Sequence, residues 1–209
     1  MILIGMFDSP FVRRVAVSMR LLGLPFEHRN WSVGKDQAAI REYNPLGRVP
    51  TLVLDDGVSL CDSATLLDYL DQQVGPERAL LPPSGVARRD ALQLMALGSG
   101  AAEKAVTQVY EGIFRPAEKQ HRPWVDRCAE QMHGALALLD AACAAKRGPY
   151  LLGERLTQAD VTGVTAWTFV HGALRVDASR YPALAAHAAR CEQMAAFADA
   201  RLDFSPPSA

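Results

Sequence analysis

The segment Asn44-Pro45-Leu46-Gly47-Arg48-Val49-Pro50-Thr51-Leu52 decides how the first third of this chain is interpreted. The apolar run from Val49 to Leu54 predicts a short strand, and a proline is tolerated at the first residue of a strand. A trans Val49–Pro50 bond would indicate an ordinary strand start and no ligand site. A cis bond would turn the backbone of Val49 outward, leaving its N–H and C=O groups free to pair with an extended peptide ligand. The residues alone leave both isomers open.

On both sides of this segment, the hydrophobic pattern alternates between the period of a strand and that of a helix. Val12, Val15 and Met19 lie three and four residues apart, which predicts a helix over 11–22. We expect Gly23 to end this helix as a left-handed cap. Asp56-Gly57 is a typical hairpin turn pair. The other expected elements are strands at 2–6, 26–31, 49–54 and 58–60 and a helix at 62–73.

The order of these elements predicts the architecture. Strand, helix and strand are followed by an ill-defined stretch and then by two strands and a helix, which is the thioredoxin-like arrangement. We therefore expect an α/β domain at 1–76 and a linker at 77–85, where proline and glycine are concentrated. Residues 86–209 are rich in alanine and leucine and predict an all-helical bundle with a frayed tail at 204–209. Its expected helices are 86–113, 123–146, 158–171 and 181–198.

Composition and charge give no reason to expect nucleic acid, a membrane or a metal ion as a partner. The net charge is −1, so the charge balance gives no reason to expect nucleic acid or an anionic membrane as a partner. The sequence has no run of 18 apolar residues and its start lacks the basic region of a signal sequence, so we expect a cytoplasmic protein. The four cysteines form no CxxC pair and the five histidines are scattered. We therefore expect reduced thiols and no metal site.

Ser9 lies between the first strand and the first helix, and Pro10 follows it. Proline is favoured at the first helical position, which makes Ser9 the N-cap. A hydroxyl there lies beside free N–H groups at the positive end of the helix dipole, where a thiolate would be stabilised. Ser9 could therefore donate a hydrogen bond to a sulfur anion. The alternative is that it only caps the helix.

Two further helix starts have the same ambiguity. Asp62-Ser63 opens the helix at 62–73 and is a good cap by itself. The Ser63 hydroxyl and nearby N–H groups could instead hold a ligand carboxylate, and Asp62 could pair with a ligand amine. The spacing of Thr157 and Asp160 is that of a capping box, for which we expect a role in folding alone.

Taken together, these signals resemble the cytosolic glutathione transferase superfamily, in particular its serine-type members of the tau-like and related bacterial kinds. The resemblance covers nearly the whole chain and is most specific in the segment 44–52 with the acidic-Ser pair after it. The matching stretches are Ser9-Pro-Phe-Val-Arg-Arg-Val15, Asn44 to Leu52, Asp62-Ser63, and Tyr150-Leu-Leu-Gly153 with Leu156-Thr-Gln-Ala-Asp-Val161.

The resemblance implies a role for each matching residue. Ser9 would activate the glutathione thiol, and Pro50 would be a cis-proline beside Val49, whose backbone would pair with the cysteinyl part of glutathione. Asp62 and Ser63 would hold the γ-glutamyl end, although family members usually carry Glu where this chain has Asp62. Arg48 and Lys35 would meet the glycyl carboxylate. The resemblance also implies a homodimer, with glutathione as co-substrate.

The implied activity is conjugation of glutathione to a small hydrophobic electrophile bound between the two domains. Phe11 from the first domain and Val106, Tyr110 and Trp167 from the helical domain are candidate walls of the electrophile site. For the last three, burial in the helical core is the alternative. Two other functions stay open: a glutathione-dependent isomerase or lyase, and a non-catalytic glutathione-binding protein with the same fold.

Overall fold

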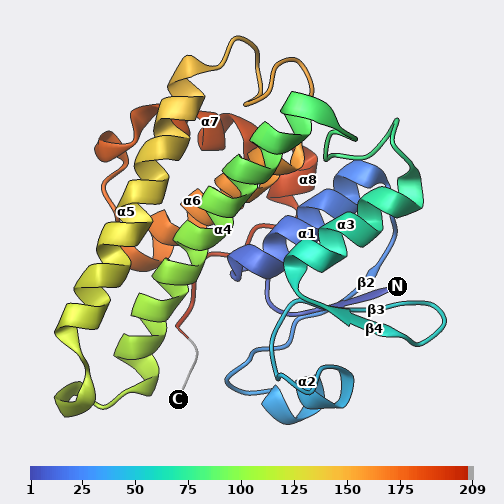
Figure 1. Ribbon diagram of the computed structural model, residues 1–209. Helices are drawn as coiled ribbons and strands as arrows, with labels where there is room; N and C mark the ends of the chain where they lie inside the picture. Colours follow the sequence, from blue (N-terminus) through green and yellow to red (C-terminus); the bar gives the residue numbers. More distant parts are fainter. Residues whose placement is uncertain (207–209) are drawn as a thin grey trace.

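A small sheet with helices on both faces is followed by a half built of helices alone in the computed structural model, which describes residues 1–206 (Figure 1). This arrangement confirms the predicted fold class, a thioredoxin-like α/β domain followed by a helical bundle. The first half contains the strands β1 (Ile2–Ile4), β2 (Glu27–Arg29), β3 (Thr51–Val53) and β4 (Ser59–Cys61) and the helices α1 (Pro10–Leu22), α2 (Gln37–Tyr43) and α3 (Ser63–Val74).

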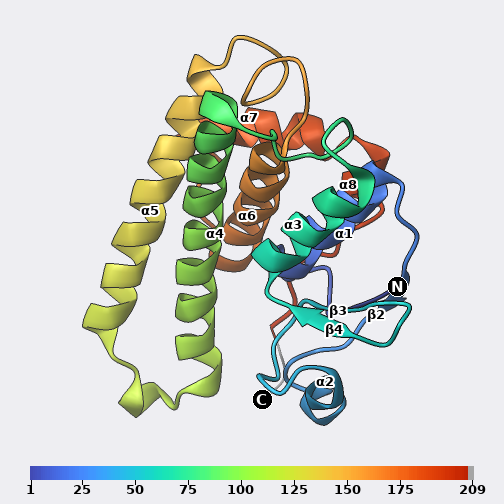
Figure 2. The same ribbon diagram turned by 45° about the vertical axis from the view of Figure 1, so that its right-hand side comes forward.

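The sheet has the strand order β2-β1-β3-β4, in which β1 and β2 are parallel and the other two pairs are antiparallel. Successive residues of a strand point to opposite faces. Leu3 and Leu52 accordingly pack with α1 and α3 on one face, whereas Ile4 and Val53 pack against Ile40 of α2 on the other. Figures 1 and 2 both show the sheet between these two helical layers.

The junction between β1 and α1 is tightly packed because residue 5 has no side chain. Gly5 has a φ of 132°, and a Cβ placed there would lie 2.5 Å from Val12 and 2.8 Å from Val49. The end of β1 therefore approaches both the first turn of α1 and the segment that precedes β3. At the other end of α1, Gly23 adopts the predicted left-handed cap with a φ of 69°.

The second half contains five α-helices and two short 3₁₀ helices within residues 1–206. They are α4 (Gly85–Phe114), η1 (Ala117–Lys119), α5 (Arg122–Ala145), α6 (Gln158–Leu174), η2 (Ala178–Arg180), α7 (Pro182–Cys191) and α8 (Ala195–Ala198). Helix α6 is buried along nearly its whole length and forms the centre of the bundle. In Figure 2, α4 and α5 run side by side along one flank of the molecule.

Two local predictions need correction. The single helix expected at 181–198 is divided into α7 and α8, because the chain turns at Glu192–Met194, where the N–H of Met194 bonds to the carbonyl of Cys191. The stretch that the pattern left ill-defined contains α2, whose single fully buried residue, Ile40, explains its weak hydrophobic signal. No helix within residues 1–206 is long and apolar enough to cross a membrane.

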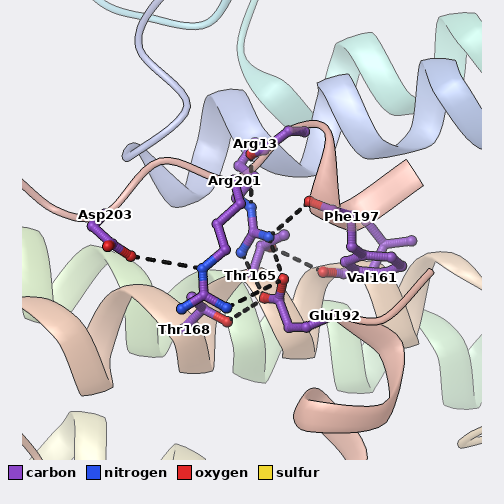
Figure 3. Close-up of polar contacts among 9 residues, drawn as sticks. Arg13, Val161, Thr165, Thr168, Glu192, Phe197, Arg201 and Asp203 are labelled. Carbon is purple, nitrogen blue, oxygen red and sulfur yellow. Dashed lines mark hydrogen bonds and ion pairs between the residues drawn. The ribbon is translucent and has the colours of Figure 1, made fainter. Parts of the chain in front are cut away.

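A buried ion pair joins the two halves (Figure 3). Arg13 of α1 donates two hydrogen bonds to the Glu192 carboxylate, at 2.7 and 2.5 Å, and further ones to the carbonyls of Phe197 and Ala200. The Thr168 hydroxyl donates to the same carboxylate at 2.7 Å. These bonds attach α8 and the start of the C-terminal segment to the helix that begins at Ser9.

Candidate functional site

A cavity of about 660 Å³ lies between the two halves. One wall comes from the first half and comprises Met6, Asp8, Ser9, Pro10, Phe11, Trp31, Ser32, Val33, Gly34, Gln37, Leu46, Gly47, Arg48 and Val49. The other wall comes from the helical half and comprises Val106, Val109, Tyr110, Ile113, Phe114, Phe169, Phe204 and Ser205. The first wall is mixed in polarity, whereas the second is almost entirely apolar.

Ser9 lies on the cavity wall at the N-cap of α1, as its sequence context predicted. Its side chain accepts the N–H of Val12 at 3.4 Å, a long distance for a hydrogen bond, and Pro10 occupies the first helical turn. The side chain is half-buried. A hydroxyl in this position faces the positive end of a 13-residue helix, which favours a bound anion.

One buried amide side chain, that of Asn44, maintains the geometry of the 44–52 segment. The Asn44 side chain donates to the carbonyl of Arg48 at 2.9 Å and to the Thr51 hydroxyl at 3.2 Å, and it accepts the N–H of Leu46 at 3.1 Å. The Val49–Pro50 bond is cis. Within residues 1–206, no hydrogen bond to the backbone N–H or C=O of Val49 is found, and both groups belong to a residue that lines the cavity.

Asp62 and Ser63 begin α3 but do not line the cavity. Asp62 is exposed, has a φ of 70°, and accepts the N–H groups of Ala64 and Thr65, so its predicted capping interaction is present. Ser63 is buried, and its hydroxyl accepts a hydrogen bond from Arg14 at 2.7 Å. Burial lowers the pKa of Arg14 to about 10, and the charge of Asp62 opposes that shift. This cluster combines a buried cation, a hydroxyl and a helix N-terminus.

The apolar wall is dominated by aromatic side chains. Tyr110 and Phe114 of α4 meet edge to face, with ring centroids 5.1 Å apart. Phe204 meets Phe169 of α6 in the same manner at 5.6 Å. Burial raises the pKa of Tyr110, the charge of Asp8 raises it further, and Arg48 opposes the shift. Aromatic walls of this kind suit a flat, apolar ligand.

The structure brings six of the predicted site residues to one cavity, and the other five are absent from its described lining. The six are Ser9, Phe11, Arg48, Val49, Val106 and Tyr110. Lys35 is exposed, Pro50 is buried, and Asp62 and Ser63 form the separate cluster at α3. Trp167 is also absent from the described lining, because it is buried in the helical core against Tyr181 and His171, as the packing alternative for it required.

Most of the lining residues were not predicted from the sequence, among them Asp8, Phe204 and Ser205. Asp8 directly precedes Ser9 but belongs to no recognisable motif of its own. Phe204 and Ser205 fall in the tail that was expected to fray, but Phe204 packs on Phe169 and Ser205 lines the cavity. An isolated aromatic residue in a polar tail was the available signal. Residues 207–209 of that tail lie outside the described part of the chain.

No group of three or more His, Cys, Asp or Glu residues within 1–206 is arranged to hold a metal ion. The four cysteines are free thiols. Burial raises the pKa of Cys143 to about 12 and that of Cys191 to about 11, so neither provides a reactive thiolate near neutral pH.

Comparison with known proteins agrees with this architecture in both halves. Residues 3–78 match the family description "Glutathione S-transferase, N-terminal domain", and residues 122–190 match "Glutathione S-transferase, C-terminal domain". The two matches together cover more than half of the chain. The chain therefore belongs to the glutathione S-transferase family.

Two curated proteins and one solved structure illustrate the similarity. The chain is 30% identical to the uncharacterised GST-like protein YibF of Escherichia coli K12 over 66% of this chain and 67% of that one. It is 27% identical to a probable maleylacetoacetate isomerase of Vibrio cholerae over 99% and 97% of the two chains. A glutathione S-transferase of Methylobacterium radiotolerans, solved in complex with glutathione sulfonate, superposes with a TM-score of 0.88 at 27% identity, covering 100% and 95% of the chains.

Proposed function

We propose that this protein conjugates glutathione to hydrophobic electrophiles, with Ser9 activating the thiol. The observation that carries the proposal is the position of Ser9, which caps α1 on the wall of a cavity whose opposite wall is aromatic. A thiolate at that helix N-terminus would be stabilised by the helix dipole and by a hydrogen bond from the hydroxyl. The apolar wall would hold the electrophile against it.

The proposal also assigns the three parts of glutathione. Its cysteinyl unit would pair with the free N–H and C=O groups of Val49, in the manner of an added strand. Its glycyl carboxylate would meet Arg48. Its γ-glutamyl end would bind at the start of α3, where Asp62 supplies a carboxylate for the amine and Ser63 a hydroxyl backed by Arg14. Lys35 is exposed and outside the described lining, so Arg48 is the cation to which we assign the glycyl end.

The chemistry needs no covalent bond to the protein. The glutathione thiol releases its proton to solvent, and the thiolate sulfur attacks the electrophilic carbon to form a C–S bond. A leaving group such as halide then departs with its electron pair. The protein contributes by lowering the thiol pKa and by holding the two reactants in line. The cavity volume of about 660 Å³ lies in the range of small-molecule sites.

Glutathione-dependent isomerisation is the second candidate, favoured by the full-length match to the probable maleylacetoacetate isomerase of Vibrio cholerae. In that reaction the thiolate adds to a double bond, the adduct rotates, and the thiolate leaves again. Glutathione is therefore regenerated by an isomerase, but it is consumed by a transferase.

Two measurements test the proposal in sequence. Titration calorimetry with glutathione, in two buffers of different ionisation heat, is expected to show binding with proton release, because the site lowers the thiol pKa. Mass spectrometry of reactions with a panel of aryl halides is then expected to show thioether products. Binding without turnover of any electrophile or maleyl compound would favour the non-catalytic alternative. No binding of glutathione would refute the proposal.

A further inference from the structure

Charge is nearly absent from the cavity. Among the described residues that line it, Asp8 and Arg48 are the two that carry full charges. The proposed function assigns Arg48 to the glycyl carboxylate of glutathione. When glutathione is bound, the Asp8 carboxylate would thus be the one uncompensated protein charge on the lining, and it belongs to the residue beside Ser9.

The Asp8 carboxylate lies on the cavity wall together with Ser9 and Ser205. Burial raises its pKa, and nearby backbone N–H groups, that of Ser205 foremost, oppose the shift because they favour the charged form. Asp8 precedes α1, whereas Ser205 belongs to the C-terminal segment 201–206, which passes between α4 and the sheet in both views (Figures 1 and 2).

The apolar wall opposite Asp8 lowers the local dielectric constant, which strengthens the electrostatic effect of this charge on a ligand. Asp8 and Tyr110 of α4 line the same cavity, and the charge of Asp8 adds to the effect of burial in raising the pKa of Tyr110. Apolar aromatic rings of Phe11, Phe114, Phe169 and Phe204 also line the space. A carboxylate on a ligand in this space would meet a like charge in a medium of reduced dielectric constant, where repulsion is several times stronger than in water.

We infer that Asp8 is a specificity-determining residue that selects uncharged aromatic electrophiles and rejects those carrying a carboxylate near the reacting carbon. This inference rests on the proposed function and deepens it. It also opposes the isomerase alternative, because maleyl compounds carry carboxylates next to the double bond that would react.

The test compares two substrates that differ in one charge. In 4-chloro-3,5-dinitrobenzamide and 4-chloro-3,5-dinitrobenzoate, the glutathione thiolate attacks the ring carbon that bears chlorine, a C–S bond forms, and chloride leaves. Each enzymatic kcat/KM is divided by the uncatalysed rate constant at the same pH, which removes the difference in intrinsic reactivity. The wild-type protein is expected to favour the amide. Asp8→Asn is expected to raise the benzoate-to-amide ratio on the order of tenfold.

Asparagine is the suitable replacement because it is nearly the same size as aspartate and its side-chain oxygen can still accept a backbone N–H, while the charge is removed. The matched control is Asp203→Asn, which makes the same change in net charge on the C-terminal segment. Asp203 is almost fully exposed and is absent from the described cavity lining. The control is expected to leave the ratio within about twofold, because exposed charges are screened by water and salt.

The outcomes separate this inference from the proposed function. Turnover of both substrates with an unchanged ratio in Asp8→Asn, or a wild-type preference for the benzoate, would overturn the role of Asp8 and leave conjugation intact. If neither substrate is turned over, the affinities of the two preformed S-aryl glutathione conjugates are measured by calorimetry. If the affinity ratio of the two conjugates changes in Asp8→Asn and not in Asp203→Asn, the specificity role of Asp8 is supported although conjugation is not. An affinity ratio that Asp8→Asn leaves unchanged, or the absence of binding, would overturn that role.

Discussion

At the scale of single residues, the hydroxyl of Ser9 has two roles that compete for the same oxygen. It accepts the N–H of Val12 at 3.4 Å, and in the proposed mechanism it also donates its proton to the glutathione sulfur. Both are compatible, because a hydroxyl accepts through its lone pairs and donates through its proton. The two roles can be separated by substitution, because glycine replaces serine well as a cap, whereas alanine does not.

We therefore expect Ser9→Ala and Ser9→Gly to behave alike in catalysis and differently in stability. Both should lower kcat/KM for an aryl halide by roughly 10²-fold, since both remove the hydroxyl. Ser9→Ala should lower the free energy of unfolding by about 1 kcal/mol and Ser9→Gly by a few tenths. Steady-state kinetics and urea denaturation measure the two effects. If Ser9→Gly retains full activity, the hydroxyl only caps the helix.

A second prediction at this scale concerns Arg48 and Lys35, the two cations that the sequence offered for the glycyl carboxylate. Arg48→Ala should weaken glutathione binding by about tenfold, the effect of losing a hydrogen bond to a charged group, and Lys35→Ala should not. Arg48 lines the cavity, whereas Lys35 is absent from its described lining. Calorimetry with glutathione and with its glycyl ethyl ester checks the assignment. The wild-type protein should discriminate between the two ligands, and Arg48→Ala should bind them equally.

At the scale of elements, the close approach of α4 to α6 depends on Gly98. A Cβ at this position would lie 3.0 Å from the Thr162 methyl group and 3.3 Å from the carbonyl of Thr162. The neighbour includes backbone of the buried central helix, which has little room to move. Gly100, two residues later in α4, faces open space. The same substitution at these two glycines should therefore have opposite effects.

We expect Gly98→Ala to lower the free energy of unfolding by about 1–3 kcal/mol, because an inserted methyl group separates α4 from α6. Gly100→Ala should raise it by up to about 1 kcal/mol, because alanine favours a helix more than glycine does. Denaturation midpoints of the two variants give the comparison. Equal stabilisation of both would mean that α4 and α6 pack less closely than the structure indicates.

Local signals predicted most element boundaries because they depend on neighbouring residues. Ser9 with Pro10, Gly23, and Asp62 mark helix ends through caps that form within one turn, and the structure has each of them. The division of 181–198 could not be predicted in this way. The turn at Glu192 is stabilised by Arg13, which lies at the other end of the chain, so no local pattern reports it.

At the scale of the whole molecule, the Arg13–Glu192 pair connects the first helix to the C-terminal segment. Burial raises the pKa of Glu192, but hydrogen bonds from Arg13 and Thr168 and the charge of Arg13 lower it more, so the net shift is downward. The unfolded chain therefore binds this proton more readily than the folded protein. The pair stabilises the fold above the ordinary glutamate pKa, near 4.5, and loses its effect as the pH falls through and below that value.

Glu192→Gln should accordingly lower the free energy of unfolding by about 3 kcal/mol near neutral pH, because it leaves Arg13 buried without its counter-ion. The difference from the wild-type protein should shrink as the pH falls below 4.5, where wild-type Glu192 becomes protonated. Urea denaturation at several pH values measures it. The control Asp199→Asn removes the exposed pair with Arg20 and should cost less than about 1 kcal/mol. A difference that does not change with pH would contradict the assignment.

The sequence by itself determined the fold class, the order of the strands and of most helices, and the position of Ser9 at the start of α1. These depend on hydrophobic period and on caps, which are properties of neighbouring residues. It also indicated the segment 44–52, whose geometry is maintained by Asn44 within the same segment.

Only the tertiary structure decided which side chains face the cavity. From the sequence, either a place on the cavity wall or burial in the helical core was possible for Val106, Tyr110 and Trp167. In the structure, Val106 and Tyr110 line the cavity, whereas Trp167 is buried in the core. The tertiary structure also brought Ser205, from the opposite end of the chain, to the cavity that Asp8 lines. The physical reason is that the facing of a helix and the path of a tail are set by packing against distant elements, which local sequence patterns do not encode.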